Sequence, residues 1–415
     1  MDNSSVTRAV ITGVGVVAPN GIGRDAFWQT LKEGRSGVSP ITVFDPGLFK
    51  AHQAGEVADF DAESFLGEKG LRNLDRSTRF LCAAAKMSLE DAGFTVKTDD
   101  LSEVGVVTAT TLSAIWNIAE FSKETVVDGP QFVNPAIFPS TTMNAPSSQV
   151  SIWFKIKGFN TTISTGYTAS LDALKYAVDF IKFNRAKAIL VAGVEGLSFQ
   201  SFVGFHKIGF LAGINGQELS CPFDKRRNGI ILGEGAGVLV IEEEEAARKR
   251  GARIYAKIDS VENCFDAYRS GKYHPYAEGL KNSMNLALKK SGLDKDKITY
   301  INAAANSVPL QDKLESFAIK EVFGAAAQNL AVTSIKSMLG ESFSAAGILQ
   351  LIAAIGSITQ NFIPPTINYL EFDPDCDLDY VTEGSRSVKV DSVLINNFGP
   401  GGNNASAIIS RYNHI

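Results

Sequence analysis

The chain has 415 residues, of which 45% are hydrophobic and 20% are charged, as is typical of a globular protein. These values exclude a disordered or collagen-like protein, and 40 basic residues against 45 acidic ones leave no basic field that would favour nucleic acid. The cysteines are too few for a disulfide scaffold and too widely spaced for a zinc finger: Cys82, Cys221, Cys264 and Cys376. We therefore expect a reduced, cytoplasmic protein without a metal site.

Short runs that favour β-strands alternate with stretches of helical periodicity along the whole chain. Strands are predicted at residues 8–13, 105–107, 161–164, 186–192, 237–241, 298–302, 392–395 and 405–409. Amphipathic helices are predicted between them, for example at residues 75–92 and 278–291. This alternation is typical of an α/β protein.

Neither the N-terminus nor the longest uncharged stretch indicates a membrane or targeting segment. The first five residues carry no basic group, and the apolar run that follows is broken by Gly13 and Gly15, so no signal peptide is expected. Between Glu341 and Glu371 the chain has no charged residue, but polar residues interrupt the apolar positions and two prolines end them. Since a membrane span needs about 20 apolar residues, we predict a helix buried on all sides inside the core.

Two segments that are far apart in the chain show the same order of elements. Residues 161–165 predict a strand that leads through a tight polar turn into a helix of small residues, and residues 330–334 are followed by a similar helix after a loop. We infer two related halves, residues 1–255 and residues 256–415.

Several motifs occur in an order that covers almost the whole chain. They include Thr12-Gly13-Val14-Gly15, Asn134-Pro135, Ser164-Thr165-Gly166-Tyr167, Pro222-Phe223-Asp224, Gly233-Glu234-Gly235-Ala236-Gly237, Lys336-Ser337-Met338 and Asn397-Phe398-Gly399-Pro400-Gly401-Gly402. This set resembles the β-ketoacyl-[acyl carrier protein] synthases. The resemblance implies a thiolase fold, in which two βαβαβαββ halves form five layers (α/β/α/β/α), and it implies a dimeric assembly.

The position of the family's nucleophile departs from the pattern. Active members carry an acyl-accepting cysteine where this chain has Tyr167. A cysteine at the N-terminus of a buried helix can become a thiolate near neutral pH, whereas a phenol with an ordinary pKa of about 10 stays protonated. The ring would also fill the space in which an acyl thioester forms.

Three further departures affect the remaining catalytic groups. The two histidines that drive decarboxylation of the malonyl extender in this family correspond to Ala304, which has no donor, and to Glu341, which would repel a developing enolate if ionised. The second amide of the oxyanion hole belongs to Pro400, which has no N–H, and the loss of one such donor costs about 100- to 1,000-fold in rate. No catalytic residue is therefore assigned.

The surrounding scaffold is kept, with Lys336, Asp312 and Glu315 where the family has a structural charge network. An inactive full-length member is similar to the chain length factor, the ketosynthase β subunit of type II polyketide synthases. The resemblance implies a heterodimer with an active ketosynthase, contact with acyl carrier protein through that complex, and no cofactor. Chain length factors usually carry glutamine at the position of Tyr167, so no role in malonyl decarboxylation is implied.

By the same resemblance, bulky residues of this subunit would close the far end of the partner's acyl tunnel. The candidates lie in a helix after residues 108–111 and in the following loop: Leu112, Ile115, Trp116, Ile118, Ala119, Phe132 and Phe138. An apolar helical stripe is also typical of a core or of a dimer interface, and these interpretations stay open. Residues 161–165 would pair with the equivalent strand of the partner.

Two other functions are compatible with the sequence. In the first, the site is repurposed and Tyr167 and Glu341 act as an acid–base pair in an acyl transfer or hydrolysis. In the second, the chain stabilises or docks a partner without measuring chain length.

Overall fold

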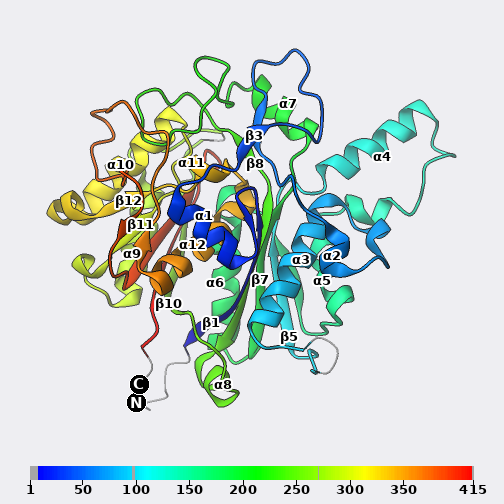
Figure 1. The fold of residues 1–415 in the computed structure, drawn as a ribbon, viewed down its shortest axis with the longest axis horizontal. Helices are drawn as coiled ribbons and strands as arrows, with labels where there is room; N and C mark the ends of the chain where they lie inside the picture. The colour runs from blue at the N-terminus through cyan, green and yellow to red at the C-terminus, as the bar shows by residue number, and fades with distance from the viewer. Residues whose placement is uncertain (1–7, 96–98, 270, 414–415) are drawn as a thin grey trace.

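The computed structural model describes residues 8–95, 99–269 and 271–413. Its main feature is one sheet with the strand order β12-β11-β15-β16-β10-β1-β9-β7-β5-β6 (Figure 1), and the short β2 (Gly21–Ile22) pairs with β1. The first half of the chain supplies β1 (Ala9–Ala18), β5 (Val104–Ala109), β6 (Asn160–Ile163), β7 (Ala188–Glu195) and β9 (Gly235–Glu243). The second half supplies β10 (Ala256–Phe265), β11 (Tyr300–Asn302), β12 (Ala331–Thr333), β15 (Ser392–Phe398) and β16 (Asn403–Arg411).

The two halves repeat the same topology. In the order β6-β5-β7-β9-β1 the successive pairs are parallel, parallel, antiparallel and antiparallel. The order β12-β11-β15-β16-β10 repeats this pattern pair by pair. The halves meet where β1 and β10 pair antiparallel. Because β10 opens the second repeat, we propose residues 1–255 and 256–415 as the two units.

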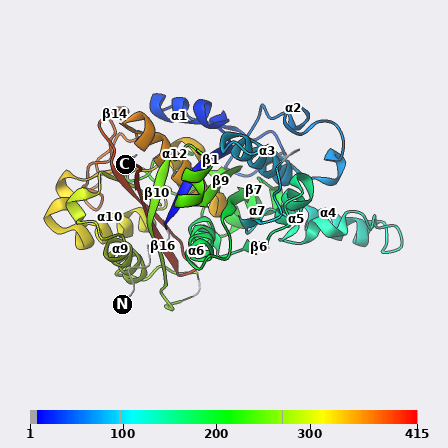
Figure 2. The same ribbon diagram turned by 90° about the horizontal axis from the view of Figure 1, so that it is seen from below.

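Two helices lie between the sheet halves and two lie outside them. α6 (Ala169–Lys182) and α12 (Ala346–Gln360) pack against strands of both halves, whereas α3 (Arg76–Asp91) covers β1, β7 and β9, and α9 (Glu278–Ser291) covers β10 and β16. Figure 2 shows α3 and α5 (Ala145–Phe154) at one side of the molecule, and α9 and α10 (Pro309–Phe323) at the other. The helices and sheet halves therefore form the five layers that the resemblance implies.

The uncharged stretch before Glu371 forms the buried helix α12, as predicted. All residues from 346 to 358 are buried, because the helix has protein on every side. Gly356 leaves room for the indole ring of Trp28, whose Nε1 donates to the Ile352 carbonyl at 2.8 Å. Within the described ranges, residues 343–360 are the one helical segment long and apolar enough to cross a membrane, and 89% of that segment is buried in the protein.

The Gly-Val-Gly sequence of β1 is explained by the helix that crosses it. A Cβ atom on Gly15 would lie 1.9 Å from the carbonyl oxygen of Ala84, and one on Gly13 would lie 2.2 Å from that of Ser88. Both carbonyls belong to α3, so only glycine lets this helix lie so close to the sheet.

The predicted elements agree with the structure except at one long strand. Every predicted strand overlaps an observed one, and the helix predicted at residues 278–291 has the bounds of α9. The prediction omits β10, because its sequence mixes charged with apolar residues. The fold accommodates this polarity. Glu262 of β10, for example, accepts a hydrogen bond from the ammonium group of Lys290 in α9 at 2.9 Å.

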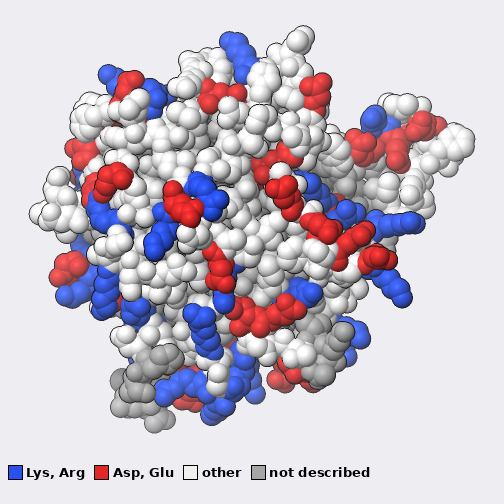
Figure 3. Space-filling view, in the orientation of Figure 1, with Lys and Arg blue, Asp and Glu red and all other residues white. Residues whose placement is uncertain are grey.

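A helical arm (residues 115–141) projects from the first half (Figure 1). It comprises α4 (Ile115–Val127), of which no residue is buried, and the loop that ends in η2 (Phe138–Thr141). Charged side chains of both signs are interspersed over the face shown in Figure 3, so neither sign dominates that face. Among the described strands, β6 stands at one end of the sheet order and has a neighbour on one side only, which is β5.

Candidate functional site

Tyr167 lies at the start of the central helix α6, in the short turn η3 (Gly166–Thr168). Gly166 has a φ of +70°, which lets the chain turn sharply from β6 into the helix. Asp172 holds the first turn, because its carboxylate accepts the Thr168 hydroxyl at 2.8 Å. The side chain at position 167 is therefore fixed at a helix N-terminus, where the dipole would stabilise a thiolate.

The phenol ring of Tyr167 fills the space in front of this helix. It meets the ring of Phe343 edge-on with 5.3 Å between the centroids, and it lies so close to Gly399 that a Cβ atom there would be 2.4 Å from the ring. Burial raises the pKa of the phenol well above its ordinary value, and Tyr273 and Glu341 add to the rise. The phenol is therefore un-ionised at neutral pH and is no substitute for a thiolate.

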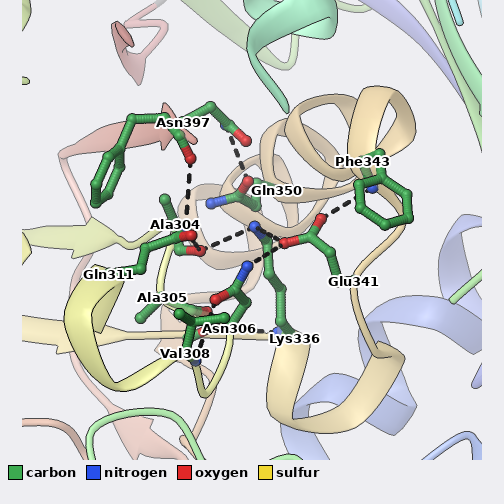
Figure 4. A network of polar contacts seen from close by, with 12 residues as sticks. Ala304, Ala305, Asn306, Val308, Gln311, Lys336, Glu341, Phe343, Gln350 and Asn397 are labelled. Atoms are coloured by element: carbon green, nitrogen blue, oxygen red, sulfur yellow. Dashed lines mark hydrogen bonds and ion pairs between the residues drawn. The ribbon is translucent and has the colours of Figure 1, made fainter. Parts of the chain in front are cut away.

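Lys336 and Glu341 form a buried ion pair beside Ala304 (Figure 4). Lys336, on α11 (Lys336–Leu339), donates from Nζ to Glu341 Oε2 at 2.8 Å and to the Ala304 carbonyl at 2.9 Å. Asn306 Nδ2 donates to the same Oε2 at 2.8 Å, and the Phe343 amide donates to Oε1 at 2.9 Å. Both oxygens of the Glu341 carboxylate are thus engaged by donors.

The two acids of the expected charge network, Asp312 and Glu315, accept hydrogen bonds from backbone amides. Asp312 accepts the N–H of Asn306 at 2.9 Å, and Glu315 accepts those of Ala304 at 2.9 Å and Ala305 at 2.7 Å. Burial raises the pKa of Asp312 to about 6 and that of Glu315 to about 7, although these hydrogen bonds oppose the rise. The two carboxyl groups therefore fix the loop that follows β11 and carries Ala304.

Pro400 lies in the loop between β15 and β16 and has no N–H because of its ring. The Gly402 amide donates to the Gly399 carbonyl at 3.1 Å and closes this loop. Since the Tyr167 ring packs on Gly399, the structure brings the loop and the nucleophile position together. At the residue after Gly399, the loop has no amide to offer an oxyanion.

Two residues at this place were not singled out from the sequence. Phe343 has a φ of +44°, which is uncommon for a residue with a side chain, and its ring also stacks on Phe205 at 4.8 Å. Glu195 is buried, accepts the amides of Thr111 at 2.6 Å and Leu112 at 3.0 Å, and has its pKa raised to about 7 by burial. Glu195 could have been identified from the sequence, because it is the single acid at the end of an apolar strand. Phe343 could not have been identified in this way, because its ring contacts come from distant segments of the chain.

The predicted tunnel residues do not line one cavity within the described part of the chain. Trp116 lines a cavity of about 350 Å³ together with residues of α3 and of the segment after β7. Leu112 and Tyr167 instead both pack against a separate apolar cluster, and Ile115 and Ala119 are half-buried. The other exposed fractions are 39% for Trp116, 45% for Ile118, 72% for Phe132 and 58% for Phe138. The interpretation as core residues is therefore wrong for these four.

Comparison with known proteins covers nearly the full chain. A model of the β-ketoacyl synthase N-terminal domain matches residues 7–247, and one of the C-terminal domain matches residues 255–370. The 3-oxoacyl-[acyl-carrier-protein] synthase 2 of Coxiella burnetii is 38% identical over 407 residues, which are 97% of this chain and 98% of that protein. The protein of the same name from Synechocystis is 36% identical over an alignment of 416 positions, which covers 99% of this chain and 100% of that protein.

Two solved structures are similar over nearly their full length. The ishigamide ketosynthase/chain length factor has a TM-score of 0.93 and 32% identity, with 99% of this chain and 100% of that chain covered. A type II polyketide synthase acyl-carrier protein in complex with its ketosynthase has a TM-score of 0.90 and 29% identity, with 98% and 100% covered. These matches confirm the predicted thiolase fold, and the chain belongs to the β-ketoacyl synthase family.

Proposed function

We propose that this chain is a non-catalytic subunit that pairs with an active ketosynthase and acts as the chain length factor of a type II polyketide synthase. The partner carries out the condensation and receives the acyl carrier protein. This chain shapes the end of the acyl tunnel at the interface and thereby limits the number of extender units. The role needs no cofactor.

The Tyr167 ring at the start of α6 is the observation that carries this proposal. The ring occupies the position at which the resemblance to the family places the nucleophile, and it packs on Gly399 and Phe343. The proposed subunit also lacks a positioned general base, which contributes about 10²- to 10⁴-fold to a rate. It lacks one oxyanion donor as well, which contributes about 10²- to 10³-fold. The relatives named as synthases are similar over the whole chain. Catalytic turnover, however, depends on the few residues of the site, so overall similarity does not by itself carry the activity over.

The open edge of the sheet supports a partner of the same fold. The Val106 amide of β5 donates to the Phe159 carbonyl at 2.8 Å, and the Thr110 amide, just after β5, donates to the Ile163 carbonyl at 3.1 Å. Because alternate residues of a strand face alternate sides, Asn160 and Thr162 direct their N–H and C=O groups away from β5. An unpaired edge of this kind is a template for another strand. The apolar residues of the arm add an exposed surface of the kind that marks protein interfaces.

The decisive experiment compares the isolated protein with its complex. We expect the isolated chain to acquire no acyl group from acyl thioesters and to leave malonyl thioester unchanged, as measured by intact-protein and product mass spectrometry. Co-expression with a ketosynthase encoded beside it should give a heterodimer that turns over both substrates. A covalent acyl group on the isolated chain, or its turnover of malonyl thioester, would instead support the repurposed enzyme with Tyr167 and Glu341 as the acid–base pair.

A stabilising or docking partner without control of chain length is the second candidate. The exposure of arm residues such as Phe132, which does not line the cavity beside Trp116, favours it. This candidate predicts that the heterodimer forms but that changes at Trp116 leave product length unaltered.

A further inference from the structure

Three donors from separate segments converge on the Glu341 carboxylate (Figure 4). Lys336 comes from α11, Asn306 from the loop after β11, and the Phe343 amide from η6 (Phe343–Ala345). Lys336 Nζ and Asn306 Nδ2 lie 2.8 Å from Oε2, and the Phe343 nitrogen lies 2.9 Å from Oε1. The group is closed to solvent, because the side chains of Lys336 and Glu341 are only 3% and 1% exposed.

Glu341 is the acid that hydrogen-bonds to Lys336, and the buried Glu315 also interacts with the Lys336 charge from farther away. The ammonium of Lys336 is also bonded to the Ala304 carbonyl, but that oxygen carries no net charge to neutralise it. A buried ion pair is strongly destabilised when one partner is removed, because the other charge is left uncompensated. The donors around Glu341 would therefore favour a replacement anion of the same shape.

We propose that Lys336, Asn306 and the Phe343 amide form a carboxylate-binding site whose resident ligand is the chain's own Glu341. The ligand class of this site is a small monocarboxylate. Replacing Glu341 by alanine removes the atoms of one acetate ion and leaves the three donors facing the space. The Glu341 carboxylate also keeps a substrate carboxylate away from Lys336. This part of the inference rests on the proposed function.

Occupation of this site also positions the aromatic residues in front of α6. The bond to Glu341 holds the amide of Phe343, which has a φ of +44°. Residues held in this region persist only when their surroundings fix them. The Phe343 ring then contacts the ring of Tyr167. Glu341 is therefore a positioning residue for the ring that fills the nucleophile position.

Acetate rescue of Glu341→Ala tests the site in the full chain. We expect a lower Tm than in the wild type, and a saturable rise of at least about 2 °C when sodium acetate replaces sodium chloride at equal ionic strength and pH. The near-ultraviolet circular dichroism of the aromatic residues should recover with the same dependence on acetate. The wild type and the double variant Lys336→Met/Glu341→Ala are the controls and should show no acetate-specific rise. An equal response in all three proteins, or none in Glu341→Ala, would overturn the proposal.

A second set of variants applies if Glu341→Ala does not fold. Glu341→Gln, Lys336→Met and their combination form a double-mutant cycle in urea unfolding. The combination should be less destabilised than the sum of the single variants, and additive effects would contradict the site. These measurements need neither a partner nor turnover. Failure here therefore leaves the proposed function standing, and turnover by the isolated chain would leave the acetate result unchanged.

Discussion

Tyr167 occupies a helix N-terminus that still suits a thiolate, so cysteine at this position reveals what else the site lacks. In Tyr167→Cys we expect condensation at least about 10⁴-fold slower than that of an active ketosynthase, because the positions that the resemblance assigns to the histidines and to one oxyanion donor hold Ala304, Glu341 and Pro400. Mass spectrometry of carrier-bound products measures this, with Tyr167→Phe as the control that keeps the ring. Rapid condensation by Tyr167→Cys alone would mean that Ala304, Glu341 and Pro400 do not silence the site.

Glu315 makes the stability of the protein depend on pH. Burial raises its pKa from the ordinary 4.5 to about 7, so the folded state binds the proton more tightly than the unfolded state. Its contribution to stability is complete below pH 4.5 and is lost as the pH rises to about 7, which amounts to about 3 kcal/mol. Glu315→Gln cannot titrate, so its free energy of unfolding should fall less steeply across this range.

Urea unfolding between pH 4.5 and 7.5 measures the slope for Glu315→Gln. The exposed Glu68 provides a matched control, since Glu68→Gln should keep the slope of the wild type. A parallel loss of stability at all pH values, with the wild-type slope, would show that Glu315 does not titrate in this range.

At the scale of elements, the arm contains apolar residues in two different environments, one beside a cavity and one exposed to solvent, which the sequence does not distinguish. Trp116 faces a cavity of about 350 Å³, whereas Val126 on the same helix is 84% exposed. In the proposed heterodimer we expect Trp116→Ala to lengthen the product by at least one extender unit, because the cavity grows. Val126→Ala is the control and should leave the product unchanged. An unaltered product from an intact Trp116→Ala complex would favour the docking function.

The base of the arm is fixed by a buried acid. Glu195, at the end of β7, accepts the amides of Thr111 and Leu112, just before α4 begins. The Asn117 side chain donates to Asp75 at 2.8 Å and ties the first turn of α4 to the start of α3. These bonds fix the base of a helix that buries none of its own residues, and Trp116 lies beside them.

At the scale of the whole molecule, the exposed edge of β6 is the feature that a second chain would complete. Thr162→Pro removes an N–H that points away from β5, so the chain should fold but bind the proposed ketosynthase partner at least about tenfold more weakly. Size-exclusion chromatography and co-purification measure the association, and circular dichroism checks the fold. Thr162→Ala keeps the N–H and serves as the control. Normal assembly of the proline variant would place the interface elsewhere.

The sequence by itself determined the fold class, the family and the chemical identity of the altered positions. Strand and helix periodicity are local, so both can be recognised in the sequence. Pro400 lacks an N–H in any conformation, and Ala304 lacks a donor in any conformation. The fold class follows from local pattern, the family from the resemblance of the ordered motifs, and the chemical identities from covalent structure, so none of them needs coordinates.

Only the tertiary structure decided which groups meet and which residues stay exposed. Glu341 binds Lys336 and Asn306, although Asn306 lies 35 positions away in the chain. Nothing in a linear pattern distinguishes that carboxylate from a free acid. The stripe that contains Trp116 and Ile118 would look the same in a core helix, and its exposure depends on the packing of distant segments. Burial and ion pairing are properties of the assembled chain, because both depend on neighbours that folding brings together.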